Sequence, residues 1–192
     1  MSCRFDIAGL YGETGALNPV LKSEFTWTLL QDSSDIPGKL EVDGLKRAFL
    51  RWQLVIPTRF KYIPNTENAD ITITFSSTDN YFKTSPNALA YAFVGTTAQP
   101  IDLVFNESYN WKLNIKQSFN NNYNPEIVGI HEIGHVLGLH HSQFDNDVMY
   151  PSYQGVSDLS LNDIERIQKI WGMLSNWQLR VKKLKGYFAR LL

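Results

Sequence analysis

The segment at residues 131–141 constrains this chain more than any other, because it contains all four of its histidines. His131 and His135 are four residues apart, so on a helix both imidazoles lie on one face and can reach the same metal ion. Glu132 directly follows the first histidine and can reach a water molecule on that ion. Gly138 can end the helix in a left-handed conformation and turn the chain, so that His141 reaches the ion as well. Three ligands and one open position predict a catalytic zinc site and a hydrolytic reaction.

The extended pattern is more specific than its first five residues. H-E-x-x-H alone also occurs on amphipathic helices, where it would be two solvated histidines and a surface glutamate. Here it extends to H-E-x-x-H-x-x-G-x-x-H and is followed by Met149, which is the long motif of one class of zinc proteases. His140 lies one residue early for this spacing. It is either a histidine beside the site or in solvent, or the third ligand in place of His141.

These residues resemble the catalytic domain of the matrix metalloproteinases, or matrixins, and the resemblance runs from about residue 23 to residue 172. His141 and Ser142 are followed by Met149 at the family's spacing. Four further segments resemble the family's methionine turn and pocket wall, its third strand, its fourth strand and its last helix: residues 149–153, 69–75, 89–93 and 159–172. The resemblance implies an endopeptidase that acts on protein or peptide substrates.

Glu132 is the predicted general base and acid. Zinc lowers the pKa of a bound water molecule, and Glu132 is placed to accept its proton and later to deliver that proton to the leaving amine. Inside an apolar helix, a glutamate has no fold role that isoleucine or leucine would not fill better. By resemblance, Met149 forms an apolar floor beneath the three imidazoles, and it could equally be an ordinary core methionine. The rival hypothesis is a non-catalytic binding module that keeps the zinc, and Glu132 argues against it.

The resemblance also implies where a substrate binds. An extended peptide would add to an edge strand of the sheet, with alternate side chains in pockets. The implied edge is Leu89, Ala90 and Tyr91, and the opposing wall includes Pro151 and Tyr153. Ile127 maps to the position that lines the family's main pocket, where an isoleucine would suit a large apolar side chain immediately after the cleaved bond.

The chain departs from the family at its other metal sites. Matrixins carry a second, structural zinc held by three histidines and an aspartate, and the aligned residues here are Ser76, Thr78, Tyr91 and Val104. The family's calcium loop corresponds to residues 82–87, where Lys83 replaces an acidic ligand, and Asn106 and Tyr109 replace further acids. We therefore expect one catalytic zinc and neither structural zinc nor calcium. The loop must be held by packing, to which Tyr81, Phe82 and Tyr91 would contribute.

The N-terminal segment, residues 1–22, gives little information on compartment. Cys3 is the only cysteine, so no intrachain disulfide forms. Its sequence context faintly resembles the zinc-blocking cysteine of the family's latency segment, and the alternative is a plain exposed thiol. The family suggests a secreted or extracellular protein, but the first residues lack the apolar run of a signal peptide. The compartment therefore stays open.

The C-terminal tail, residues 173–192, is a separate electrostatic unit. The chain has 18 basic and 19 acidic side chains, and five of the basic ones but none of the acidic ones lie in the tail. The tail has an apolar stripe at helical spacing, formed by Trp177, Val181, Leu184, Phe188 and Leu191. It is either a helix packed on its own domain or a basic segment that binds an acidic membrane surface or partner. The acidic remainder argues against nucleic acid, and we expect a monomer.

The pattern of apolar residues predicts an α+β fold, with a mixed sheet under two helices. A 192-residue chain with 43% hydrophobic residues can bury one sizeable core, so residues 23–172 form one catalytic domain. A first amphipathic helix is expected over residues 41–55 and a half-buried strand over residues 71–75. The active-site helix should begin after Asn124 and run to Gly138, and a capping box of Ser160 and Asp163 should start the last helix.

Overall fold

Alternating apolar residues in the first strand set the inner face of the sheet. Phe25, Trp27 and Leu29 of β1 (Glu24–Gln31) are buried, because every second side chain of a strand points to the same face. The computed structural model describes residues 21–64, 66–92 and 100–175, in which a five-stranded sheet has the order β2-β1-β3-β5-β4. β4 is antiparallel to β5, and the other pairs are parallel. The other four strands are β2 (Arg59–Tyr62), β3 (Ile71–Ser76), β4 (Ala90–Ala92) and β5 (Ile101–Asn106).

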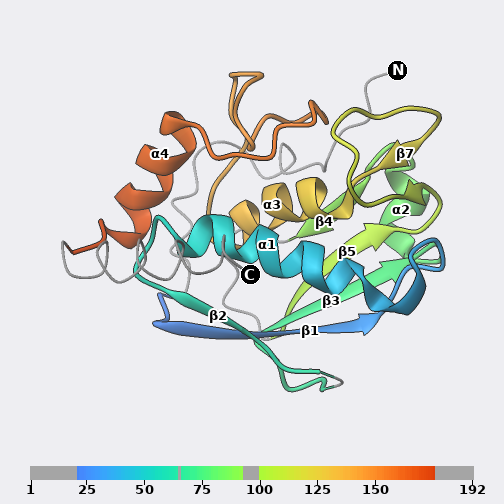
Figure 1. Ribbon diagram of the computed structural model, residues 1–192, viewed down its shortest axis with the longest axis horizontal. Coiled ribbons are helices and arrows are strands. Elements are labelled where there is room, and N and C mark those ends of the chain that lie inside the picture. The colour runs from blue at the N-terminus through green and yellow to red at the C-terminus, as the bar shows by residue number, and fades with distance from the viewer. Residues whose placement is uncertain (1–20, 65, 93–99, 176–192) are drawn as a thin grey trace.

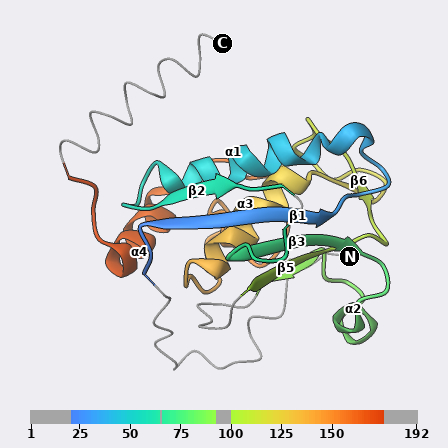
Figure 2. The same cartoon turned by 90° about the horizontal axis from the view of Figure 1, so that it is seen from below.

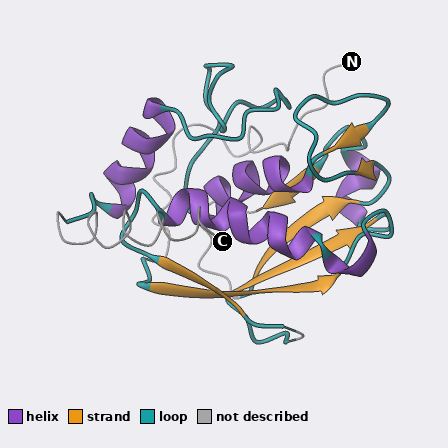
Figure 3. Ribbon diagram, viewed as in Figure 1, coloured by secondary structure: helices purple, strands orange, loops and turns teal. Residues whose placement is uncertain are grey.

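Two helices, α1 (Glu41–Gln53) and α3 (Pro125–Val136), cover one face of this sheet (Figures 1 and 3). Figure 2 shows the opposite face, with the strands in front of α3. α4 (Leu161–Trp171) lies at one end of the sheet, where the rings of Trp171 and Phe25 meet edge-on with centroids 6.0 Å apart. Within the described ranges, no helix is both long and apolar enough to cross a membrane. The smaller elements are η2 (Pro37–Lys39), α2 (Asn80–Thr84), β6 (Asn110–Trp111) and β7 (Asn122–Tyr123).

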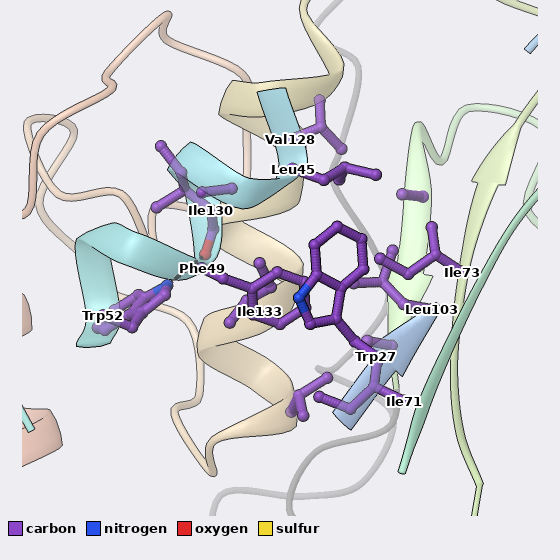
Figure 4. Packing of buried hydrophobic residues seen from close by; sticks show 14 of the residues in the cluster. Trp27, Leu45, Phe49, Trp52, Ile71, Ile73, Leu103, Val128, Ile130 and Ile133 are labelled. Atoms are coloured by element: carbon purple, nitrogen blue, oxygen red, sulfur yellow. Dashed lines mark hydrogen bonds between the residues drawn. The ribbon is translucent and has the colours of Figure 1, made fainter. Parts of the chain in front are cut away.

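Aromatic rings fill the layer between the sheet and the helices. Trp27 of β1 stacks on Phe49 of α1, with ring centroids 4.7 Å apart. Trp52 of α1 donates a hydrogen bond of 2.8 Å from Nε1 to the carbonyl of Ile130, which joins α1 to α3. Figure 4 shows these rings among aliphatic side chains such as Ile133. Full burial of each large apolar side chain contributes about 1.5–3 kcal/mol, so this layer fixes α3 firmly against the sheet.

The α+β class and the mixed sheet are confirmed. The predicted first helix over residues 41–55 ends slightly earlier, at Gln53. Asn124 caps α3 as predicted, and α4 begins with the predicted capping box. Phe93, the last residue of the predicted fourth strand, lies outside the described residues, as do Cys3 and residues 176–192 of the tail.

The prediction of a half-buried strand at residues 71–75 was wrong in one respect. Thr72 is only 4% exposed, although it points away from the face that carries Ile71 and Ile73. β3 lies between β1 and β5, and the Thr72 hydroxyl donates to the carboxylate of Asp102 on the neighbouring strand. The central position of β3 and this hydrogen bond bury the second face of the strand at Thr72, although Thr74 stays partly exposed, and an alternating pattern does not reveal this.

An aromatic cluster holds the segment around residues 82–87, which corresponds to the family's calcium loop but lacks its acidic ligands. The rings of Tyr81 and Tyr91 lie 4.3 Å apart between centroids, and Phe82 contacts both rings at 5.7 and 5.6 Å. Phe82 is buried against Val104 of β5. The predicted packing role of Tyr81, Phe82 and Tyr91 is therefore confirmed.

Hydrogen bonds from β5 and the residues after it reinforce that cluster. Asn106 donates from Nδ2 to the carbonyl of Ala88 at 3.0 Å, and the Tyr109 hydroxyl donates to the carbonyl of Pro86 at 3.2 Å. Both residues occupy positions at which the family resemblance implies acidic calcium ligands. In this chain, neutral side chains bind the segment directly through its backbone carbonyls.

Gly134 of α3 is a site where a single methyl group should destabilise the fold. A Cβ atom at this position would lie 2.3 Å from the sulfur of Met149 and 3.0 Å from Trp52. Overpacking of a filled core typically destabilises a protein by about 1–3 kcal/mol, whereas replacing glycine by alanine in a helix stabilises it by about 1 kcal/mol. We expect Gly134→Ala to lower the free energy of unfolding measured by chemical denaturation.

Gly44→Ala is the matched control for this prediction. Gly44 also lies in a helix, but its added Cβ would meet its nearest neighbours at 3.4 Å, which is ordinary van der Waals contact. This variant should be as stable as the parent or more stable. If Gly134→Ala proved as stable as Gly44→Ala, the tight contact between Gly134 and Met149 would not exist in solution.

Candidate metal centre

The local sequence of α3 explains both where it starts and where it stops. The Asn124 side chain accepts a hydrogen bond of 2.9 Å from the backbone N–H of Glu126, and Pro125 occupies the first helical position, where no N–H is needed. The last helical residue is Val136, and Gly138 has φ of 100°, a left-handed conformation that favours glycine. The chain therefore leaves the helix axis after the second histidine.

This turn brings three histidines together. One ligand nitrogen from each of His131, His135 and His141 lies within 4.8 Å of the others. The Nε2 atoms of His131 and His135 are 3.0 Å apart. Both of these side chains are fully buried, and His141 is half-buried. Among the described residues, His140 is not part of this group, so the geometry supports His141 as the third member.

Backbone carbonyls fix the orientation of two imidazoles. His131 Nδ1 lies 2.8 Å from the carbonyl oxygen of Val148, and His135 Nδ1 lies 2.7 Å from that of Leu139. Because a carbonyl oxygen only accepts hydrogen bonds, each Nδ1 carries the proton and donates it. Each Nε2 then presents a lone pair to the centre of the histidine group. This is the orientation that ligands of a metal require.

The donor set fits zinc. Because each Nδ1 faces a backbone carbonyl, the Nε2 atoms of His131 and His135 face each other across 3.0 Å, close enough for one ion to be shared between them. Imidazole nitrogens are preferred zinc ligands, and three of them with one open position are typical of catalytic sites. The group is therefore consistent with one catalytic zinc.

Glu132 is fully buried on α3, next to His131. A carboxylate is costly to remove from water unless a charge, a metal ion or hydrogen bonds compensate it. An apolar side chain would pack better at this position of an otherwise apolar helix, so packing does not explain the glutamate. Glu132 is thus a buried acid that directly follows the first histidine of the group, and its role as proton carrier stays a prediction.

The segment at Met149 packs against α3. Met149 is fully buried and contacts Gly134 on α3, one turn after His131. Ser142 donates its backbone N–H to the carbonyl of Met149 at 2.7 Å, which joins the two ends of the segment that follows the third histidine. Met149 is therefore a core residue packed on α3 between the first two histidines in sequence, and its role as a floor beneath the imidazoles stays a prediction.

Asp163 has a second role that the sequence did not reveal. Beyond its place in the capping box, its carboxylate accepts hydrogen bonds from the backbone N–H groups of Val148 at 2.9 Å and Met149 at 3.4 Å. Burial raises the pKa of Asp163, although the hydrogen bonds from Val148 and Ser160 act in the opposite direction. The capping motif identified the residue, but its contacts with Val148 and Met149, 15 and 14 positions earlier, depend on the tertiary fold.

Asp147 is another polar contributor that sequence reasoning missed. Burial acts to raise its pKa, but hydrogen bonds from Ser142, Ser160 and Asn162 outweigh burial, so the pKa lies below its usual value. One donor follows α3 in the chain, and the other two are the N-cap of α4 and a residue in its first turn. No motif in the sequence connects them.

The implied substrate residues lie at the sheet edge and near α3. Leu89 and Ala90 are fully buried, and Tyr91 is half-buried on β4, which is an edge strand packed beside α3 (Figure 1). Ile127 is buried within α3. The structure therefore brings β4 and α3 together. The hydroxyl of Tyr91 donates to Asp79 at 3.2 Å, which fixes the outer side of the strand.

The opposing wall follows the methionine turn. Pro151 and Tyr153 are half-buried, and the Tyr153 ring meets Tyr123 of β7 edge-on with centroids 5.3 Å apart. Burial raises the pKa of Tyr153 to about 12, so its hydroxyl stays protonated near neutral pH. Gly155 approaches the carbonyl of Lys116 so closely that a Cβ would lie 2.2 Å from its oxygen. The wall is thus packed against the segment before α3.

Comparison with known proteins agrees with this site. A model of the Matrixin family matches residues 20–172. Matrix metalloproteinase-18 of Xenopus laevis is 32% identical over 176 residues, which cover 88% of this chain and 36% of that protein. Matrilysin of Rattus norvegicus is 35% identical over 155 residues, which cover 77% of this chain and 56% of that protein.

A third relative, macrophage metalloelastase of Rattus norvegicus, is 34% identical over 161 residues, which cover 79% of this chain and 33% of that protein. The chain therefore spans between about a third and just over half of the length of these relatives. The family match includes the whole of the three-histidine site, the sheet and α4. This chain belongs to the matrixin family.

Proposed function

We propose that this chain is a zinc-dependent endopeptidase. The observation that carries the proposal is the convergence of the His131, His135 and His141 nitrogens, together with the full burial of Glu132, which directly follows His131 on α3. These three histidines would hold the ion. When bound, zinc lowers the pKa of water toward neutrality and polarises a carbonyl group. Met149 and Gly138 support the site, since one packs beneath α3 and the other turns the chain toward His141.

Glu132 carries the proton in this proposal. Its carboxylate accepts the proton that the attacking water loses, and the resulting carboxylic acid donates it to the nitrogen of the leaving amine. The carboxylate is then regenerated, so no proton is lost or gained over a cycle. Burial excludes bulk water from Glu132, which keeps the proton available to the leaving group.

A protein or peptide substrate would lie extended along β4. Leu89, Ala90 and Tyr91 would supply the edge, and Pro151 and Tyr153 the facing wall. Support comes from the position of β4 at the sheet edge beside α3, which is the geometry that β-augmentation needs. Ile127, also on α3, would line the pocket for a large apolar side chain.

Replacement of Glu132 tests the mechanism. Glu132→Ala should keep the fold and the zinc, because the ligands are other residues, and should lose most of its activity. A general acid-base group typically contributes about 10²- to 10⁴-fold. We expect a fall of at least this size in the cleavage of an unfolded protein, with zinc content measured by elemental analysis.

Glu126→Ala is the control, since Glu126 lies on the same helix and pairs with Arg47 at 2.7 Å, away from the histidines. Its turnover should be close to that of the parent. Near-normal turnover in Glu132→Ala would end the proposed mechanism. Parent protein that binds zinc but cleaves nothing would instead favour the non-catalytic binding module.

Metal content tests the departure from the family. We propose that the chain holds a single zinc and responds little to calcium. Val104 is buried against Phe82, Tyr91 is engaged with Asp79, and Lys83 places a cation in the segment that aligns with the calcium loop. Elemental analysis should give one zinc per chain, and none after His131→Ala. Two tightly bound zinc ions, or a large rise in melting temperature in millimolar calcium, would contradict the alignment.

We also propose that residues 173–192 bind an acidic surface. The support is their net positive charge and apolar stripe, and all but residues 173–175 lie outside the described part of the chain. The intact chain should sediment with acidic lipid vesicles at low salt, and raised salt should weaken this binding. Deletion of residues 176–192 should abolish it while peptide cleavage continues.

Charge reversal of Lys182 and Lys183 to glutamate is the control variant, because it keeps the apolar stripe. It should also release the chain from the vesicles. If the intact chain did not bind at low salt, or if the deletion lowered the melting temperature, the tail would be a helix packed on its own domain.

A further inference from the structure

The third histidine depends on a segment without regular structure. No helix or strand lies between the end of α3 at Val136 and the start of α4 at Leu161, a stretch that the structure describes in full. His131 and His135 are held by the helix itself, but His141 follows the turn at Gly138. Contacts from elsewhere in the fold must therefore hold the backbone at His141.

Arg166 of α4 supplies such a contact. Its guanidinium donates from Nη2 to the carbonyl of His140 at 2.6 Å and to the carbonyl of His141 at 3.3 Å. These are charge-assisted hydrogen bonds, which are stronger than neutral ones. Arg166 therefore holds the two peptide groups that flank the Cα atom of His141.

The same face of α4 also holds the middle of this segment. Asp163, three residues before Arg166, accepts the backbone N–H groups of Val148 and Met149. The carbonyl of Val148 in turn accepts the Nδ1 proton of His131. One turn of α4 thus reaches His141 through Arg166, and reaches His131 through Asp163 and Val148.

Burial of the charged Arg166 side chain costs free energy. The residue is half-buried, and burial lowers its pKa, while the nearby carboxylates of Asp163 and Asp147 act to raise it. An apolar side chain of similar volume would fill this position without the cost of desolvating a cation. The guanidinium is explained by what its Nη2 binds, which is the backbone of the third histidine and of the residue before it.

We propose that Arg166 is a positioning residue for the third zinc ligand, so that its loss weakens zinc binding through His141 alone. The inference rests on the proposed zinc site of His131, His135 and His141. Outer contacts that orient metal ligands typically change metal affinity by about 10- to 100-fold when they are removed. We expect a change of this size in the dissociation constant for zinc.

The test compares zinc affinity in Arg166→Met and Arg166→Lys, by competition with a chromophoric chelator. Methionine keeps the apolar stem but removes the donors, so affinity should fall by about 10- to 100-fold. Lysine can still donate to one carbonyl and should restore part of it. Lys169→Ala removes a charge from an exposed position of the same helix and should leave the affinity unchanged.

A double-mutant cycle separates positioning from a general effect on the fold. In a His141→Ala background, Arg166→Met should no longer change the affinity, because the ligand that it positions is absent. In the cobalt-substituted protein, the visible absorption of Arg166→Met should shift toward that of His141→Ala. Thermal unfolding of the metal-free protein should be nearly the same with and without the substitution.

Three results would overturn the inference: an unchanged zinc affinity in Arg166→Met, an equal loss of affinity in the His141→Ala background, or failure of the metal-free variants to fold. The last result would show that Arg166 acts on the fold and not on the ligand. Parent protein that binds no zinc would overturn the proposed function itself, and this outcome is distinguishable because it appears before any variant is made.

Discussion

The site depends on the hydrogen bonds between two histidine side chains and the backbone. His131 and His135 donate their Nδ1 protons to the carbonyls of Val148 and Leu139. Each bond ties an imidazole of the helix to a segment that follows it in the chain, so the orientation of the ligands and the path of the chain after α3 determine each other. The turn at Gly138 is the condition for both, because only a sharp exit from the helix brings Leu139 back beneath His135.

Local features of the fold were predictable because their causes are local. The cap at Asn124, the proline at the first helical position, the end of α3 near Gly138 and the capping box of Ser160 and Asp163 each follow from residues a few positions apart. The strand at residues 71–75 shows where prediction from local sequence fails. Whether Thr72 faces solvent is decided by Asp102, 30 residues away on a neighbouring strand, and no periodicity in the strand itself contains that information.

The same limit applies to the site. The spacing of the histidines predicts which side chains converge, because the helix and one turn relate them. It does not predict the contacts of Asp163 and Arg166 with the segment after α3, nor that of Asp147 with Asn162, which exist only once α4 has packed at the end of the sheet. All three side chains are partly or fully buried, yet along the sequence Asp147 looks like an ordinary loop residue, and Asp163 and Arg166 look like ordinary charged residues near a helix start.

Two segments beside the site are held by different physical means. The segment before and within β4 is held by the rings of Tyr81, Phe82 and Tyr91 and by neutral hydrogen bonds from Asn106 and Tyr109. The segment after His141 is held by charged groups of α4. Aromatic packing is insensitive to pH and salt and needs no ion, which suits an edge strand that must stay fixed. A ligand backbone requires directional contacts instead, because zinc affinity depends on where each nitrogen points, and only hydrogen bonds specify direction as well as distance.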